Sequence, residues 1–414
     1  MLKKIMTMGM AVLVLGALIL SCGCSGSGEK SNATLLIGGI GPLSGDYANY
    51  GISTRNGETM AVDEINAAGG INGFTFKLDF QDSQGDGASA VSAYGKLQDE
   101  GMDVSLGAVL SGETAQVVAA AAADGILVLT PTGSSKDCIQ GNDNAFRVCF
   151  NDPQQGAASA QYIYDNHLAT KVAVFYGSDN TYCEGLYKIF DAKCKELGIE
   201  IVTVQAFTDG TNTDFTTQIN AIKASGAKLV FLPIYAKEAA TFLTQANGKL
   251  TDVIYFGCDG LDGILEKISN TEYVEGLLNL TPFATDEDRP IVQNFVKNYK
   301  EKFGKTPDQF AADGYDAVYA IAEALKKTGV TPETKGDDFN AKMVSAMTQI
   351  TVDGVTGTMT WDPDGETEKA AKAMIIRNGE LKLYTGADNN RQDYGRRAFY
   401  RKRERGCLAS SSPV

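Results

Sequence analysis

Polar side chains that could hold a small charged ligand follow an apolar segment where a strand gives way to a helix. The run Ser111-Gly112-Glu113-Thr114 comes directly after the apolar segment 106–109 and opens an alanine-rich helical stretch. The hydroxyl of Ser111 and the backbone N–H groups of this first turn, within which Thr114 lies, can donate to a carboxylate, and the helix dipole favours an anion there. A serine that simply caps its helix would give the same pattern, so both interpretations stay open.

An acidic side chain stands at a comparable position further along the chain. The run Tyr255-Phe256-Gly257-Cys258-Asp259-Gly260 places Asp259 at the carboxyl end of an apolar strand. A cation buried without a partner is costly, and the two charged ends of a zwitterion need separate, opposite partners. A carboxylate at Asp259 would therefore suit an amino acid. Taken alone, an Asp-Gly pair is more typical of a turn.

The sequence lacks the usual motifs for catalysis, nucleotide binding and metal binding. Segment 39–45 has its third glycine out of register for a dinucleotide loop, and Pro42 removes an N–H that a pyrophosphate would need. No Gly-x-Ser-x-Gly elbow and no P-loop lysine occurs, and the single histidine, His167, cannot anchor an ordinary zinc site. We therefore expect no enzyme, no metal and no cofactor.

Apolar runs alternate with helical stretches from residue 35 onward, which is typical of α/β folds with parallel sheets. Each strand-helix-strand unit has about 30 residues, as a right-handed crossover requires. The predicted strands are 35–39, 76–80, 106–109, 126–129, 172–176, 199–204, 229–232, 253–256, 358–361, 374–377 and 381–383. The predicted helices are 52–66, 88–100, 114–123, 184–197, 215–224, 237–246, 289–303, 310–327 and 337–350.

Residues 35–73 resemble the amino terminus of the branched-chain (leucine, isoleucine, valine) amino-acid-binding proteins of ABC importers, which are type I periplasmic binding proteins. The resemblance rests on an apolar strand, the run Gly41-Pro42-Leu43-Ser44-Gly45, the pair Tyr50-Gly51 and a helix that ends in segment 63–73. It extends over residues 34–384 and implies two doubly wound parallel-sheet lobes, joined by a three-strand hinge. Lobe 1 would comprise residues 34–150 plus 283–356, and lobe 2 residues 151–282 plus 357–384.

The same resemblance implies which residues touch the ligand. In such proteins a serine at the position of Ser111 holds the α-carboxylate, and an acid at the position of Asp259 pairs with the ammonium. A backbone carbonyl at Thr132 and a hydroxyl at Ser134 would meet the ammonium and the carboxylate, although their segment, 130–135, could also be a simple polar turn. Glutamate is usual where Asp259 stands, so reach and selectivity differ here. The aromatic contacts would be Tyr50, Tyr182 and Tyr235, unless these only pack the lobes together.

We therefore expect a monomeric, extracytoplasmic protein that binds an amino acid, branched-chain or otherwise aliphatic, and delivers it to the membrane subunits of an ABC permease. The alternative is the same fold binding a short-chain amide, urea or an aromatic acid for uptake or sensing. An amide would have less use for Asp259, and a pure acid would be repelled by it. The net charge of −14 argues against a nucleic-acid partner and against direct attraction to anionic lipids.

The first residues are predicted to export and anchor the protein. Two lysines precede an apolar stretch at 10–20 that is too short to span a bilayer, and Ile19-Leu20-Ser21-Cys22 follows it. Residues 1–22 would form a lipoprotein signal peptide, with Cys22 as the lipid-bearing residue and Cys24 as its rival. An ordinary secretory signal is the alternative. Residues 23–33, small and polar, would be a flexible tether between the membrane anchor and the fold.

The last 30 residues and the cysteines allow two further predictions. Residues 385–414 hold seven Lys or Arg against three Asp or Glu and show no strand or helix period, so we expect a basic, disordered tail. A tail that binds nucleic acid or lipid is the alternative. Of the eight cysteines, Cys138 and Cys149 flank the turn 141–144 and could close a hairpin disulfide in an exported protein.

Overall fold

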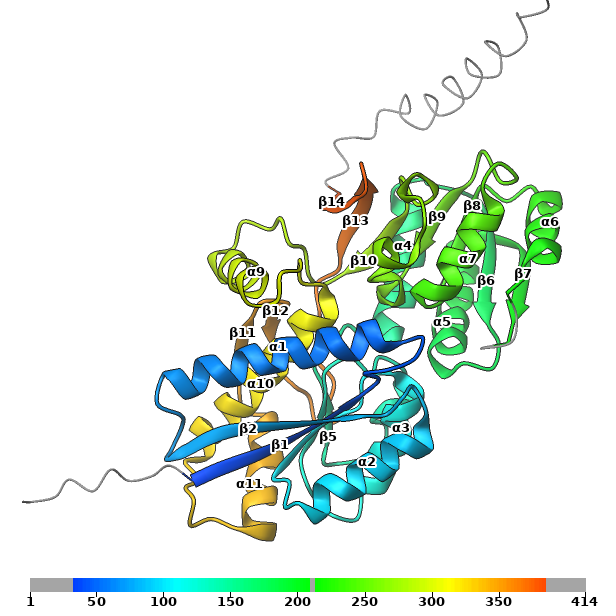
Figure 1. The fold of residues 1–414 in the computed structure, drawn as a ribbon. Helices are drawn as coiled ribbons and strands as arrows, with labels where there is room; N and C mark the ends of the chain where they lie inside the picture. Colours follow the sequence, from blue (N-terminus) through cyan, green and yellow to red (C-terminus); the bar gives the residue numbers. More distant parts are fainter. Residues whose placement is uncertain (1–32, 209–212, 385–414) are drawn as a thin grey trace, which may run out of the picture. The chain divides into compact units, whose positions relative to one another are not determined.

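The computed structural model describes residues 33–208 and 213–384, and these form two β-sheets with helices packed on them (Figure 1). The first sheet has five strands in the order β2-β1-β3-β4-β5. The second has seven, in the order β14-β13-β10-β9-β8-β6-β7, and β11 and β12 form a separate pair. The predicted signal peptide with Cys22 and Cys24, and the predicted tail, lie outside the described residues.

All five strands of the first sheet run parallel, and helices cover both of its faces (Figure 1). The interior residues of β1 are almost all buried, as expected of a central strand in such a sheet. Helices α1, α10 and α11 share one apolar cluster with the sheet, and α2 and α3 share another. The strands are β1 (Ala33–Gly41), β2 (Phe74–Asp82), β3 (Val104–Gly107), β4 (Val128–Thr130) and β5 (Ala145–Arg147). The helices are α1 (Ala48–Ala67), α2 (Gly87–Asp99), α3 (Ser111–Ala121), α9 (Pro290–Phe303), α10 (Gln309–Thr328) and α11 (Gly336–Met347).

The second sheet is parallel through its first five strands and ends in an antiparallel hairpin, β13–β14. Asn378 and Gly379 turn this hairpin with positive φ at both positions, as a two-residue type I′ turn requires. Its strands are β6 (Lys171–Gly177), β7 (Glu200–Phe207), β8 (Leu229–Leu232), β9 (Ile254–Gly257), β10 (Leu278–Thr281), β13 (Lys372–Arg377) and β14 (Glu380–Leu383). Its helices are α4 (Asp152–Asp165), α5 (Thr181–Leu197), α6 (Thr216–Ser225), α7 (Ala236–Ala246) and the short α8 (Ile264–Lys267), with a 3₁₀ turn η2 (Asp259–Leu261).

Every strand and helix predicted from the sequence has a counterpart, but one was given the wrong partner. Segment 358–361 was expected to join the second sheet, whereas β12 (Gly357–Met359) pairs with β11 (Val352–Gly354). Trp361 packs in the core of the first sheet, where its indole N–H donates to the backbone oxygen of Arg147 at 2.7 Å. After β10, the chain returns to the second sheet at β13. An apolar pattern predicts a strand, but it does not show which strand lies beside it. The lobe boundaries stay predictions.

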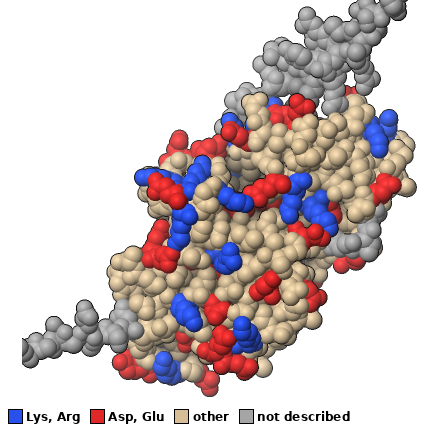
Figure 2. All heavy atoms as spheres, viewed as in Figure 1, with Lys and Arg blue, Asp and Glu red and all other residues tan. Residues whose placement is uncertain are grey.

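The predicted hairpin disulfide is not formed. Cys138 and Cys149 are buried free thiols. The turn between them leads into β5, which pairs in parallel with β4 instead of folding back as a hairpin. Within residues 33–208 and 213–384, none of the helices combines the length and apolar character needed to cross a bilayer. On the face seen in Figure 2, acidic and basic side chains are interspersed.

Helices α1 and α10 pack closely because glycine stands where they touch. A Cβ on Gly57 would overlap the backbone oxygen of Ala311, and one on Gly314 would collide with the backbone of Thr54. The hydroxyl of Tyr315 adds a 2.6 Å hydrogen bond to Glu64, from one helix to the other. The position of the first turn of α10 thus depends on Gly57.

Replacing Gly57 with alanine is therefore expected to lower the free energy of unfolding by ~1–3 kcal/mol, the usual effect of overpacking. Gly95→Ala is the matched control, because Gly95 lies in α2 with open space around it. It should leave stability unchanged or raise it by up to ~1 kcal/mol, as alanine favours a helix. Urea unfolding of the two variants measures both effects. Equal stability of the two would contradict the close contact.

Candidate ligand-binding site

Two loops at the strand ends of the first sheet are tied to each other. Ser111 is the first residue of α3, and the preceding Leu110 is its N-cap without a side-chain hydrogen bond. The hydroxyl oxygen of Ser111 accepts from the backbone N–H of Ser135 at 3.2 Å, and the hydroxyl of Thr132 donates to the oxygen of Val109 at 2.7 Å. Ser111 therefore does not cap its helix, which removes the simpler explanation of this serine.

A buried arginine holds the second of these loops in place. Arg147, at the end of β5, is fully buried, and its Nη1 donates to the carbonyl oxygens of Gly133, Ser134 and Ser135 at 2.9, 2.7 and 3.0 Å. Its Nε lies 2.8 Å from Oε2 of Glu366. The sequence analysis missed Arg147. Its one signal was a charged residue within an apolar segment, 145–150.

Asp259 presents a buried carboxyl group from the second sheet. It follows β9, is only 3% exposed, and accepts hydrogen bonds from the hydroxyl of Tyr182 at 2.7 Å and the side-chain amide of Gln155 at 2.8 Å. Burial raises the pKa of Asp259 to about 6, against the hydrogen bonds, which lower it. A cation at this carboxylate would favour its ionised form. Gln155, one turn into α4, was also missed from the sequence.

A second buried acid, Asp152, interacts with the charge of Asp259. Asp152, the first residue of α4, is buried, and burial together with the charge of Asp259 raises its pKa well above the ordinary value. The sequence analysis treated Asn151-Asp152-Pro153 only as a boundary between lobes. Two neighbouring buried acids make this part of the protein favourable for a positive charge.

Aromatic rings form the remaining wall. Tyr182 stacks on Tyr235 with ring centroids 4.9 Å apart, Tyr235 lies 5.5 Å from Tyr50, and Tyr50 lies 4.7 Å from Phe310. Phe310 is the second residue of α10 and was not predicted from the sequence, since an apolar residue there looks like ordinary helix core. The rings give the site an apolar side next to its polar groups.

Six of the eight predicted contact residues line one small cavity. They come from loops at the strand ends of both sheets, which is where ligands bind in open parallel sheets. The cavity measures about 10 Å³, roughly the space of one water molecule, so its walls must separate before an amino acid can enter. The lining residues are Ser111, Thr132, Ser134, Tyr182, Tyr235 and Asp259, with Val109, Leu110, Gly260 and Phe310.

The other two predicted residues do not line this cavity. The hydroxyl of Thr114 donates within its own loop, to the backbone oxygens of Ala108 and Leu110 at 3.0 and 2.9 Å. The hydroxyl of Tyr50 donates to the oxygen of Gly260 at 2.6 Å and accepts from the N–H of Ala236 at 2.9 Å. Tyr50 thus joins α1 to two loops of the second sheet.

Two α/β sheets whose strand ends meet around a closed, polar and aromatic cavity define a solute-binding protein. Residues 34–380 match the model of the periplasmic binding protein family, and the chain belongs to that family. The predicted fold class and the resemblance are confirmed. Membership also means that the chain binds a solute and is not an enzyme. An extracytoplasmic location follows from the same family.

Named relatives agree with this assignment. The chain is 29% identical to Leu/Ile/Val-binding protein homolog 3 of Brucella melitensis, over 82% of this chain and 90% of the relative. It is 33% identical to Leu/Ile/Val-binding protein BraC3 of Rhizobium johnstonii, over 72% of this chain and 81% of the relative.

Solved structures share the fold as well. The branched-chain amino acid transporter substrate-binding protein LivJ of Streptococcus pneumoniae, in complex with isoleucine, is 28% identical with a TM-score of 0.77 and covers 85% of this chain and 99% of its own. A solute-binding protein of R. palustris in complex with benzoate is 21% identical with a TM-score of 0.76, over 85% of this chain and 95% of its own. The second likeness concerns the fold alone.

Loss of the buried arginine should loosen the loop that it holds. Arg147→Met is expected to lower the free energy of unfolding by ~3–5 kcal/mol, because it leaves buried carbonyl groups and Glu366 without their cationic partner. Arg147→Lys should lose less, since it keeps the charge but not the planar fork of donors. Chemical denaturation of the two variants measures this order. Equal losses would show that the donor geometry does not matter.

Proposed function

We propose that this chain is the binding protein of an ABC importer and that its ligand is an amino acid, branched-chain or otherwise aliphatic. The observation that carries the proposal is the buried carboxyl group of Asp259, which shares one cavity with the hydroxyl groups of Ser111 and Ser134. An acid and a set of neutral donors at one cavity match the two charged ends of a zwitterion. The relatives named for leucine, isoleucine and valine support the same ligand class.

The proposed contacts divide between the two sheets. The ligand ammonium binds Asp259, and its carboxylate accepts from Ser111, Ser134 and the N–H groups of the first turn of α3. The ligand side chain lies against the rings of Tyr182, Tyr235 and Phe310, where apolar area is buried. The hydrogen bonds of Tyr50 to Gly260 and Ala236 then help to hold the lobes closed over the ligand.

Export and anchoring belong to the same proposal. A signal peptide that ends at Cys22, followed by the polar tether 23–33, would hold the protein at the outer face of the cell membrane. A binding protein fixed in this way delivers its ligand to permease subunits in the same membrane. We propose that it acts there as a monomer.

A binding survey tests the ligand class. The chain from residue 31 onward, unfolded and refolded to remove any bound ligand, should bind one equivalent of an aliphatic amino acid in calorimetry. Urea, acetamide and benzoate should not bind, because they lack a cation for Asp259. Binding of only an amide or an aromatic acid would keep the transport role but contradict the assignment of Asp259.

A single substitution tests the role of Asp259. Asp259→Asn keeps the shape of the side chain but removes its charge, so amino-acid binding should weaken by ~2–5 kcal/mol, as happens when a buried charge pair loses a partner. Because the pKa of Asp259 is about 6 in the free protein, the affinity of the wild type should also fall as the pH drops below 6. The affinity of the variant should stay constant between pH 7 and 5.

The stability of the free protein is expected to change with pH in the opposite direction to its affinity for the ligand. A carboxyl group whose folded pKa lies above its unfolded value of ~3.9 binds its proton more tightly when folded, so this group stabilises the free protein as pH falls from 6 to 4. Calorimetry and unfolding curves of the wild type and Asp259→Asn separate the two effects. A pH-dependent affinity in the variant would assign the titration to another group.

A further inference from the structure

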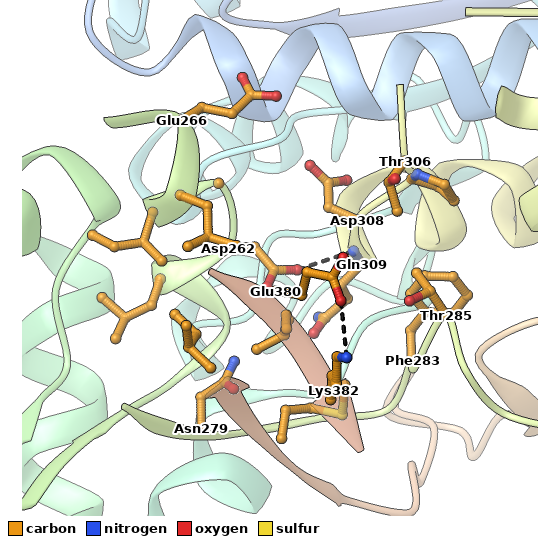
Figure 3. Close-up of a pocket in the computed structure, with 18 of the residues that line it drawn as sticks. Asp262, Glu266, Asn279, Phe283, Thr285, Thr306, Asp308, Gln309, Glu380 and Lys382 are labelled. Carbon is orange, nitrogen blue, oxygen red and sulfur yellow. Dashed lines mark hydrogen bonds and ion pairs between the residues drawn. The ribbon is translucent and has the colours of Figure 1, made fainter. Parts of the chain in front are cut away.

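A second cavity, which we call the hinge cavity, lies beside the turn that carries Asp259 (Figure 3). It has a volume of about 660 Å³, within the usual range of small-molecule sites. Its walls include β10, the β13–β14 hairpin and α8 from the second sheet, and the segment between α9 and α10. Neither the family assignment nor the proposed amino-acid site explains a cavity at this place.

One buried and one half-buried acid stand at one end of the hinge cavity. Asp262 is 6% exposed, and its Oδ2 accepts from the backbone N–H of Gln309 at 3.0 Å. Asp308 caps α10 by accepting from the N–H of Ala311 at 2.9 Å. Burial, and then the charge of Asp308, raises the pKa of Asp262 well above its ordinary value. Two of the lysines that line this cavity are in ion pairs, Lys382 with Glu380 at 2.9 Å (Figure 3) and Lys305 with Glu266 at 3.2 Å.

An unpaired amide oxygen provides a second, independent sign of a ligand. Asn279, on β10, is 3% exposed and lines the cavity, and its side-chain Oδ1 is buried with no hydrogen-bond partner. Figure 3 shows its side chain reaching into the cavity from the strand below Asp262. Leaving a buried acceptor unsatisfied costs about 1–3 kcal/mol, so a donor on a ligand would be favoured here.

The rest of the lining decides what kind of ligand fits. Leu277, Phe283, Met374 and Ile376 give the cavity apolar walls. In the part of the chain that the structure describes, no three His, Cys, Asp or Glu side chains are grouped as metal ligands. A carboxylate and a free acceptor beside apolar walls therefore suit an organic ammonium group with a hydrocarbon portion better than a metal ion.

We propose that the hinge cavity binds a small primary amine, with its ammonium between Asp262 and Oδ1 of Asn279 and its hydrocarbon part against the apolar walls. The cavity and the amino-acid site share two pieces of the chain. Asp259 and Asp262 lie at the two ends of one turn, and Gln309 and Phe310 are successive residues of α10. An amine in the hinge cavity therefore contacts the same turn that presents Asp259 to the amino acid.

Calorimetry of the refolded protein with n-butylamine, and with n-butanol as the uncharged control, tests the proposal. We expect n-butylamine to bind and n-butanol not to bind, because the alcohol brings no charge to Asp262. Asp262→Asn keeps an acceptor for the Gln309 N–H and should weaken amine binding at least tenfold. Asp259→Asn, in the amino-acid site, removes a charge that also acts on Asp262, so it should change amine binding by much less than Asp262→Asn does.

A loss of binding in Asp262→Asn could also result from misfolding, so a second variant that should gain affinity is needed. Asn279→Asp places a carboxylate where the unpaired amide oxygen lies, so n-butylamine should bind several-fold more tightly. The proposal is overturned if the wild type does not bind the amine, if Asp259→Asn abolishes binding, or if Asn279→Asp weakens it. Loss in Asp259→Asn would place the amine in the amino-acid site, which leaves the proposed transport function standing.

Discussion

Buried negative charge is the constraint that governs the region where the strand ends of the two sheets meet. Asp313 and Asp316 are buried in α10, and burial raises the pKa of both, that of Asp313 to about 8, against the charge of Lys369, which lowers them. The ammonium of Lys369 donates to the hydroxyl of Thr356 and interacts with the charges of these two acids, while Asp259 accepts hydrogen bonds from neutral groups. A buried carboxyl group in such surroundings either keeps its proton or gains a cation. In the proposed binding mode, the ammonium of the ligand supplies this cation.

The two walls of the amino-acid site are held by different kinds of interaction. On the first sheet, Arg147 holds a loop through hydrogen bonds to three carbonyl groups, which do not depend on a ligand. On the second sheet, Tyr182 and Gln155 orient Asp259 but leave its charge uncompensated. The contact of Tyr50 with Gly260 crosses between the walls. In the proposed binding mode, a loop already held in place on one side and a carboxyl group without a cationic partner on the other let the ligand itself stabilise closure.

The sequence was sufficient for most of the elements, because buried parallel strands and amphipathic helices have distinct apolar patterns. It missed the short strands β5, β10 and β11, which have only three or four residues each. It was also sufficient for site residues at the ends of strands, such as Ser111 and Asp259, where position follows from topology. It missed Arg147, Gln155 and Phe310, whose roles depend on which loop the folded chain brings beside them. Segment 358–361 was misplaced for the same reason, since pairing partners are decided by tertiary contacts.

The order of elements along the chain also bears on when each part can fold. One face of the first sheet is covered by α10 and α11, which are synthesised after nearly all of the second sheet. Because α1 covers only part of that face, its core is complete only when the chain has been made as far as α11, and closing such long-range contacts is slow. In contrast, β6 to β10 and α4 to α7 are continuous in sequence. The first sheet therefore completes its apolar core only after β6 to β10 have been made.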